Sequence, residues 1–245
     1  MGRIRIGIGG WNFPEWRKGV FYPADLPQKR ELEYASRALT SIEINATYYG
    51  SQKPESFQKW HDETPDDFSF AVKASRFATS RRKLAEGAES IDRFLNSGIT
   101  RLGTKLGPIN WQFAETKQFD AEDFAAFLAL LPEEQDGLPL RHAIEARHDS
   151  FCAPEAADLC RARNIALVRA MDSKFPDIDV QTADFAYARL MGTQDVDNGY
   201  DAAGLDKWAA EARRMADGRE LYLYVIAGTK SRNPACATAL IHRLS

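Results

Sequence analysis

Eight segments of the chain are candidate β-strands, several of which alternate apolar with polar residues in the two-residue period of a strand, and helical segments separate them. The strand segments span residues 3–10, 41–45, 68–73, 109–113, 140–146, 165–171, 185–191 and 221–226. A chain of 245 residues with short connections and no linker-like stretch favours a single (β/α)8 barrel of the TIM type over a sandwich or a helical bundle. We therefore expect one barrel domain covering residues 1–245.

An open, doubly wound α/β sheet is the main alternative fold for this pattern. That fold binds phosphate through Gly-x-Gly-x-x-Gly after a strand, whereas the first strand here ends in Gly7-x-Gly9-Gly10-Trp11. The spacing does not match, so the barrel is preferred. Gly7 and Gly9 also clear the inner face of the first strand, which predicts that another group approaches its backbone closely.

Composition limits the functions that the chain can carry. Its formal net charge of −3 argues against a surface that traps nucleic acid over its whole area, although a local basic patch is compatible with it. The three cysteines, Cys152, Cys160 and Cys236, show no metal-ligand spacing and predict reduced thiols in a cytoplasmic protein. No apolar run reaches membrane-spanning length, so we expect no association with a membrane.

The second strand segment shows how the barrel would present a site. Ile42 and Ile44 alternate with Glu43 and Asn45, so a strand here turns its isoleucines to the covering helices and its polar side chains to the interior. Tyr48 follows in the next loop. Because active sites of TIM barrels lie at the carboxyl ends of the strands, we include Tyr48 among the substrate-binding candidates.

The loop after the first strand is rich in aromatic residues. Between residues 11 and 27 it carries two tryptophans, two phenylalanines and a tyrosine. A small satellite core is the simpler interpretation, and a wall that stacks against a ring or a base is the alternative. Under the second interpretation Trp11 contributes to substrate binding.

Five short motifs follow one another along the chain. They are Gly9-Gly10-Trp11, Phe21-Tyr22-Pro23, Glu43-Ile44-Asn45-x-Thr47-Tyr48-Tyr49, Phe70-x-Val72-Lys73-Ala74 and Glu145-x-Arg147-His148. Together they resemble the YecE-like family, the domain of unknown function numbered 72, over nearly the whole chain. The resemblance implies a TIM-type barrel and no established reaction or substrate. Two segments depart from the family pattern: residues 225–228 stand where an Asn-Asn turn is usual, and residues 113–115 replace the usual prolines.

Polar side chains gather at the predicted carboxyl ends of strands two to seven. The inward phase of these strands contains Glu43, Asn45, Lys73, Gln112, Glu145, Arg147, Asp172 and Arg189. Arg3, Arg5 and Arg141 come early in their strands, at the end that serves stability. A purely structural network of buried ion pairs would also explain the first set. However, desolvating a buried ion costs several kcal/mol, which favours a functional, partly hydrated pocket.

The favoured hypothesis is a metal-free enzyme that acts on an anionic (phosphorylated or carboxylated) or polyhydroxy substrate. Arg147 and Arg189 would clamp the anion, and Lys73 would add charge or, in a less favoured role, supply a Schiff-base amine. Glu145 or Asp172 would be the general acid–base, with Glu43 as its partner. A hydrolase, a lyase or an isomerase would each fit. The assigned catalytic residues are Glu145, Asp172, Glu43 and Lys73, and the assigned substrate-binding residues are Arg147, Arg189, Asn45, Gln112, Tyr48 and Trp11.

A divalent-metal-dependent phosphoester hydrolase is the first alternative. Glu43, Glu145, His148 and Asp172 would supply carboxylate and imidazole ligands of the kind that such a site uses. However, His148 lies in the opposite strand phase to Glu145, and a lone histidine is more often structural. No metal or other cofactor is therefore favoured.

A non-catalytic binder of nucleic acid or of a phosphorylated ligand is the second alternative. Basic residues follow strands three and eight, and the aromatic first loop could stack bases. These basic residues are Arg76, Arg81, Arg82, Lys83, Lys230 and Arg232. A solvated, salt-bridged surface explains them more simply in an acidic protein, so nucleic acid is not the favoured partner.

Overall fold

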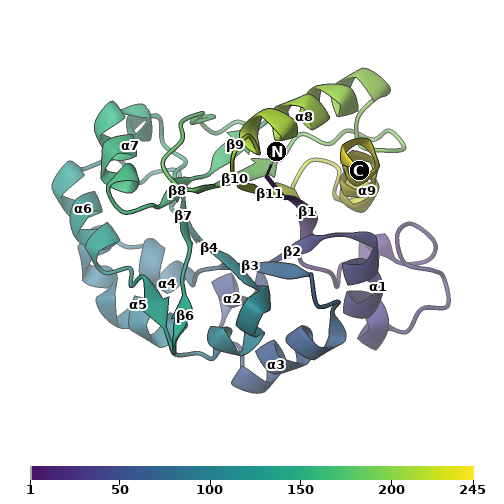
Figure 1. Cartoon of the computed structure of the whole chain (residues 1–245), viewed down its shortest axis with the longest axis horizontal. Helices are drawn as coiled ribbons and strands as arrows, with labels where there is room; N and C mark the ends of the chain where they lie inside the picture. Colours follow the sequence, from purple (N-terminus) through teal and green to yellow (C-terminus); the bar gives the residue numbers. More distant parts are fainter. Residues whose placement is uncertain (1) are drawn as a thin grey trace.

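The computed structural model describes residues 2–245, and its parallel strands form a ring (Figure 1). Met1, the first residue of the predicted domain, lies outside the described residues. The strands of the ring are β1 (Ile4–Gly9), β2 (Ser41–Ile44), β3 (Ser69–Lys73), β4 (Leu106–Gln112), β7 (His142–Glu145), β8 (Ala166–Leu167), β9 (Arg169–Met171), β10 (Phe185–Leu190) and β11 (Glu220–Val225). β8 pairs with β7 and β9 pairs with β10, so the segment predicted as a single sixth strand closes the ring. The fold is a TIM-type (β/α)8 barrel, as predicted.

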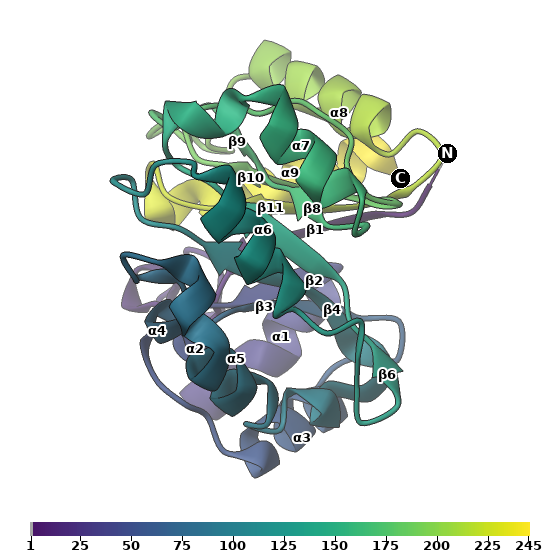
Figure 2. The same ribbon diagram turned by 90° about the vertical axis from the view of Figure 1, so that its left-hand side faces the viewer.

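Helices surround the ring, and Figure 2 shows the strands between two groups of them. The α-helices are α1 (Glu31–Ala38), α2 (Ala46–Tyr49), α3 (Pro54–Glu63), α4 (Arg76–Thr79), α5 (Ala88–Leu95), α6 (Ala121–Ala129), α7 (Pro154–Arg161), α8 (Ala202–Met215) and α9 (Asn233–Leu244). Short 3-10 helices span Pro14–Trp16, Gln28–Arg30, Leu84–Gly87, Ile99–Lys105, Asp149–Cys152 and Lys230–Arg232. Within residues 2–245, no helix combines the length and the apolarity needed to cross a bilayer.

Each barrel strand packs its two faces against different partners. Ile42 and Ile44 of β2 belong to the outer core beneath the helices, and both are fully buried. Glu43 lies between them in the chain, is equally buried and faces the interior of the ring, where it contacts Tyr187. The interior below it is filled by aromatic rings, since the Tyr187 and Tyr224 ring centres are 5.3 Å apart. The predicted alternation in the second strand is thus confirmed.

The glycines of β1 admit close neighbours, as the sequence predicts. A Cβ atom on Gly7 would lie 1.9 Å from the carbonyl oxygen of Ser41, and one on Gly9 would lie 2.5 Å from Nδ2 of Asn45. The first contact is with backbone, so only glycine fits at position 7, whereas a side chain at position 9 would displace the Asn45 amide. Gly9 therefore makes room for an amide at the mouth of the barrel.

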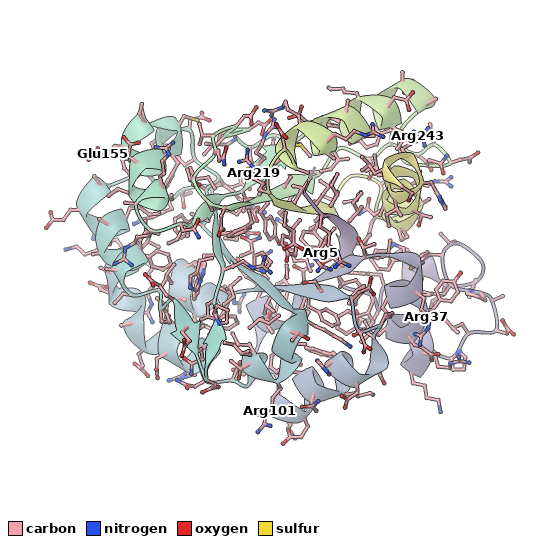
Figure 3. All side chains as sticks on the ribbon, viewed as in Figure 1. Arg5, Arg37, Arg101, Glu155, Arg219 and Arg243 are labelled. Carbon is pink, nitrogen blue, oxygen red and sulfur yellow. The ribbon has the colours of Figure 1, made fainter. Side chains whose placement is uncertain are left out.

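The amino-terminal end of the barrel has a charged cluster of its own. Arg5 and Arg141 bind the two carboxylate oxygens of Glu220 at 2.5 and 2.8 Å, and Arg141 also donates to the Tyr222 hydroxyl at 2.6 Å. Figure 3 shows Arg5 within the ring of strands. The two arginines share this one carboxylate, and Arg5 also donates to the carbonyl oxygen of Asp67 at 2.8 Å. Both guanidiniums are therefore held by hydrogen bonds, and their placement at the structural end agrees with the prediction.

β4 begins earlier than the sequence predicts. It starts at Leu106 and runs through Gly107 and Pro108, and its pairing with β3 shifts register between Phe70 and Val72. A bulge of this kind accommodates the missing N–H of a proline within a sheet. Gly107 and Pro108, which the predicted segment 109–113 leaves out, therefore belong to the strand.

A short antiparallel hairpin between α6 and β7 was not predicted. It consists of β5 (Glu134–Gln135) and β6 (Leu138–Pro139), and its turn residues Asp136 and Gly137 have φ angles of 51° and 77°. An Asp-Gly pair with two positive φ angles is typical of a type I′ turn. This dipeptide is the feature of the sequence from which the hairpin could have been predicted. The hairpin lies at the same end of the barrel as both chain termini (Figure 2).

Candidate active site at the barrel mouth

Two buried glutamates share one arginine near the carboxyl ends of the strands. Arg189 of β10 donates from Nη2 to Oε1 of Glu43 at 3.0 Å, and from Nη1 to the two oxygens of Glu145 at 2.8 and 2.7 Å. Both glutamates are 0% exposed. Because β2, β7 and β10 are not neighbours in the ring, Arg189 ties together distant parts of the barrel wall.

Asn110 and Tyr187 complete the hydrogen bonding of these carboxylates. The Asn110 amide donates to Glu43 at 3.3 Å and to Glu145 at 3.0 Å, and the Tyr187 hydroxyl donates to Glu43 at 2.5 Å. We did not predict either as a site residue. Their strand phase could have identified them, since Asn110 and Tyr187 lie two residues before Gln112 and Arg189, which were both predicted as site residues.

Arg147 adds a second guanidinium to Glu145 and is the more exposed of the two arginines. Its Nε and Nη2 donate to Oε1 of Glu145 at 2.8 and 2.6 Å, and Nη2 also donates to Oε1 of Gln112 at 2.8 Å. The guanidinium lies 4.3 Å from the ring centre of Phe175, in the loop after β9. Its Nη1 makes no hydrogen bond with residues 2–245, so donors remain for a ligand.

These contacts fix the charge state of Glu145. Burial alone would raise its pKa, but the charges of Arg189, Arg147 and Lys73 outweigh that effect and lower the pKa to about 2. Hydrogen bonds to the ionised form act in the same direction. Glu145 is therefore a permanently charged anchor for cations and a weak base at neutral pH.

Lys73 of β3 is a buried cation without a counter-ion in direct contact. It is 7% exposed, and its ammonium makes no hydrogen bond or ion pair with the residues that the structure describes. Its Nζ lies 4.3 Å from the ring centre of Tyr48, which fits a cation–π contact. Burial and the nearby charge of Arg189 lower the pKa of Lys73 to about 8, against the opposing effect of Glu43 and Glu145.

The charges of this cluster do not cancel. Lys73, Arg147 and Arg189 carry three positive charges when protonated, whereas Glu43 and Glu145 carry two negative ones. One positive charge is left over in a poorly hydrated place. A site of this kind attracts an anion, because the attraction is stronger where water is scarce.

Three polar atoms near this cluster are buried and lack a hydrogen-bond partner among residues 2–245. They are Oδ1 of Asn45, Oδ1 of Asn110 and Nε of Arg189. Most buried polar groups in proteins have a partner. Two acceptors and one donor near the same mouth are therefore consistent with a site that takes a polar ligand.

The structure does not bring Asp172 into the predicted constellation. Asp172 is exposed, has a φ of 49°, and accepts a hydrogen bond from the Tyr200 hydroxyl at 2.6 Å. It makes no contact with Glu43 or Glu145 through a hydrogen bond or a shared cation. The predicted role of Asp172 as acid–base partner of the buried glutamates is thus corrected.

The predicted metal ligands do not assemble either. The ring Nδ1 of His148 contacts Oγ of Ser150 at 2.9 Å and caps the following 3-10 helix. Across residues 2–245, no group of three or more His, Cys, Asp or Glu side chains is placed to hold a metal ion. The set formed by Glu43, Glu145, His148 and Asp172 is therefore not a metal centre in this structure, and His148 has a structural role.

The aromatic first loop forms a packed cluster. The Trp11 ring lies 5.2 Å from that of Trp60 and 6.4 Å from that of Phe70, and both partners belong to the outer core region. Trp11 thus packs outside the strands instead of facing the glutamates. Asn45 differs, because its amide reaches the backbone of Gly9 at the mouth.

The basic residues on the rim are only partly engaged. Arg81 donates to Oγ of Ser90 at 2.8 Å, and Arg232 pairs with Asp195 at 3.1 Å, whereas Arg82 and Lys83 are exposed.

A cavity of about 820 Å³ lies at the opposite, amino-terminal end of the barrel, beside the β5–β6 hairpin. None of the charged residues of the mouth lines this cavity.

The ring of strands and the polar cluster at its carboxyl end define a TIM-type barrel of the α/β class. The chain belongs to the DUF72 family, described as protein of unknown function, whose model matches residues 5–245. The predicted family resemblance is thus confirmed.

Curated relatives include two proteins of the UPF0759 group. The chain is 29% identical to YecE of Escherichia coli K12 over 154 residues, which is 61% of this chain and 50% of YecE. It is 27% identical to YunF of Bacillus subtilis 168 over 156 residues, which is 62% of this chain and 53% of YunF. The match thus spans about half the length of these relatives.

Solved structures with the same fold include two proteins of this family. The Thermotoga maritima protein aligns with a TM-score of 0.74 at 24% identity, covering 98% of each chain. The Enterococcus faecalis protein aligns with a TM-score of 0.78 at 18% identity, covering 98% of this chain and 94% of the other. A xylose isomerase domain containing protein of Salmonella typhimurium reaches 0.55 at 10% identity, over 98% and 95% of the two chains. These similarities establish the fold.

Proposed function

We propose that the protein is an enzyme that binds a small anionic substrate at the carboxyl end of the barrel and uses Lys73 to move protons. The supporting observation is a buried ammonium that has no ion-pair partner in the described part of the chain and lies in a cluster with one excess positive charge. Both arginines of the cluster bind a carboxylate. Lys73 binds none among residues 2–245.

Arg147 is the residue best placed to hold the anion. Its side chain is 17% exposed, against 3% for Arg189, and its Nη1 makes no hydrogen bond within residues 2–245. Stacking on Phe175 and bonding to Gln112 fix the orientation of the guanidinium. A pre-oriented guanidinium is suited to a carboxylate or a phosphate.

Lys73 is better suited to acid–base chemistry than the glutamates. A general base works best when its pKa lies near the working pH, and the pKa of Lys73 is lowered to about 8. Glu145 is saturated by two guanidiniums and an amide, and its pKa is about 2. The glutamates thus position the cations, in place of the carboxylate acid–base role that we predicted.

The alternatives have less support. A metal-dependent hydrolase would need a different ligand set, since the predicted one is not assembled. A nucleic-acid binder would rely on the exposed rim residues Arg82 and Lys83, in a chain with a formal net charge of −3. A cytoplasmic location stays a prediction based on the three cysteines, which are unpaired thiols in the described structure.

Thermal denaturation with inorganic phosphate tests the proposal. Saturation at one hundred times the dissociation constant should stabilise the protein by about 2.7 kcal/mol, or roughly 5–11 °C for a domain of this size. Arg147→Gln should abolish this shift and Arg147→Lys should weaken it. The matched control, Arg82→Gln on the exposed rim, should leave it unchanged. A shift that depends on Arg82 and not on Arg147 would move the anion site to the rim and overturn the proposal.

A further inference from the structure

Two buried lysines of this chain differ in one respect. Lys105 is 3% exposed, and its ammonium donates to the carbonyl oxygens of His61 and Thr64 at 2.6 and 2.7 Å. Lys73 is 7% exposed and donates to nothing in the described residues. Both lysines are thus buried, but of the two only Lys73 has a side-chain nitrogen without a hydrogen-bond partner among the described residues.

The side chains around Lys73 leave its nitrogen without a hydrogen-bond or ion-pair partner among residues 2–245. The two carboxylates that could have bound it are occupied, since Glu43 and Glu145 are both bound by Arg189 and Asn110. The Tyr48 ring on one side offers only its face. An amine held in this way can react once it has lost its proton.

We propose that Lys73 is a nucleophile that forms an imine with a small aldehyde or ketone bearing a carboxylate or phosphate group. This inference rests on the proposed anion site, because Arg147 would hold the charged group. The mouth is crowded by Tyr48, Gln112 and Phe175, so the carbonyl compound must be short. The lysine thereby becomes a covalent catalyst in addition to a proton carrier.

The step balances without any further reactant. The neutral amine of Lys73 attacks the carbonyl carbon, an N–C bond forms, and the π electrons of the C=O bond move to oxygen. A proton passes from nitrogen to that oxygen and gives a carbinolamine. The hydroxyl then takes up a proton and leaves as water, while the nitrogen lone pair forms the C=N⁺ bond. Ammonium plus carbonyl therefore becomes iminium plus water, and the charge of the cluster is the same before and after.

The iminium would also fit the cluster electrostatically. Before the reaction the cluster holds one excess positive charge, and Glu43 and Glu145 lie near enough to favour a cation at Lys73. The iminium carries the same charge at the same nitrogen. The carboxylate or phosphate of the bound compound would then neutralise the excess charge.

Reductive trapping tests this inference. The whole protein is incubated near pH 7 with glyoxylate or with pyruvate, reduced with borohydride, digested and mapped by mass spectrometry. The reduced adduct should appear at Lys73 at least about tenfold above any exposed lysine such as Lys53, since an ordinary lysine with a pKa of about 10.4 is almost fully protonated at pH 7. Lys105 is the internal control for burial and should stay unmodified. Inorganic phosphate should suppress the adduct at Lys73 only.

One variant, together with the wild-type protein, separates the imine from the anion site. Lys73→Arg retains the charge and should keep the stabilisation by phosphate, while the adduct disappears. If phosphate stabilises the wild-type protein through Arg147 but no adduct forms at Lys73, the imine is overturned and the anion site stands. If phosphate gives no stabilisation and adducts appear only on exposed lysines, both proposals are overturned. Mapping on the wild-type protein decides the matter even where a variant fails to fold.

Discussion

The ammonium of Lys73 lies 4.3 Å from the ring centre of Tyr48 and has no hydrogen-bond acceptor within residues 2–245. In a barrel interior otherwise rich in satisfied ion pairs, this contact marks the one cation of the mouth cluster that has no carboxylate bound to it. The protein thus keeps an energetically unfavourable group at the end of the barrel where chemistry takes place in this fold.

Replacing Lys73 should stabilise the protein. Its pKa is lowered to about 8 in the folded state, and the unfolded value is about 10.4, so protonated Lys73 disfavours folding at pH 7 by up to about 3 kcal/mol. Lys73→Met keeps the apolar stem and leaves two arginines against two glutamates. We expect urea denaturation at pH 7 to show a gain of about 1–3 kcal/mol.

The matched variant at Lys105 should behave in the opposite way. Lys105→Met leaves the carbonyl oxygens of His61 and Thr64 without their buried donor, which should destabilise the protein by about 1–3 kcal/mol. Losses of similar size for Lys73→Met and Lys105→Met would show that Lys73 is an ordinary structural residue.

Removing the charge of Glu145 should be strongly destabilising. Glu145→Gln leaves Arg147 and Arg189 short of a buried counter-ion, and breaking a buried pair in this way costs about 3–5 kcal/mol. Asp172→Asn serves as the comparison, because Asp172 is exposed and its one side-chain hydrogen bond within residues 2–245 is with the Tyr200 hydroxyl. Equilibrium denaturation should show a loss below about 1 kcal/mol for Asp172→Asn, the size expected of one exposed hydrogen bond. Equal losses would contradict the separation of Asp172 from the cluster.

His142 should make the fold sensitive to mild acid. Its Nε2 lies 2.7 Å from the carbonyl oxygen of Pro132, and its Nδ1 accepts from Nε1 of Trp111 at 3.1 Å, so the neutral ring satisfies both partners. Burial lowers its pKa to about 4. Because the unfolded state binds the proton more readily, stability should fall by about 3 kcal/mol as the pH drops from about 6.5 to 4.

A glutamine at this position tests the histidine effect. His142→Gln does not titrate, so denaturation curves between pH 7 and pH 4 should show a smaller loss than in the wild-type protein. Parallel losses in both proteins would assign the acid sensitivity to other groups.

The reaction of Lys73 with glyoxylate should have its own pH profile. The neutral amine is the reactive form, so the trapped adduct should increase as the pH rises through about 8 and then level off. Adducts on exposed lysines should keep increasing towards pH values of about 10.4. Parallel profiles would show that Lys73 is not perturbed.

The fold could be predicted because its signals are local. Alternating segments such as residues 41–45 and the asymmetry between aliphatic and polar phases depend on the period of a strand alone. The same phases correctly placed Glu43, Lys73 and Arg189 on the inner face. Irregular features were harder, since the early start of β4 requires a bulge against β3 that strand periodicity does not encode.

The site could be predicted only in part because direction within a loop depends on tertiary contacts. Asp172 follows the strand segment in the correct phase, but its φ of 49° ends the alternation and turns it to Tyr200. Trp11 leaves the mouth because Trp60 and Phe70 offer it a packing site. Asn110 and Tyr187 were missed because an amide and a phenol look like ordinary interior residues until their carboxylate partners are known.

The most direct test of the anion site is the pKa of Lys73 itself, measured by NMR on protein with isotopically labelled lysine, with and without phosphate. We expect a pKa of about 8 without phosphate and a higher value at saturation, because a nearby anion favours the ammonium. Arg147→Gln should remove the increase. An ordinary lysine pKa of about 10.4 that phosphate does not change would contradict the account.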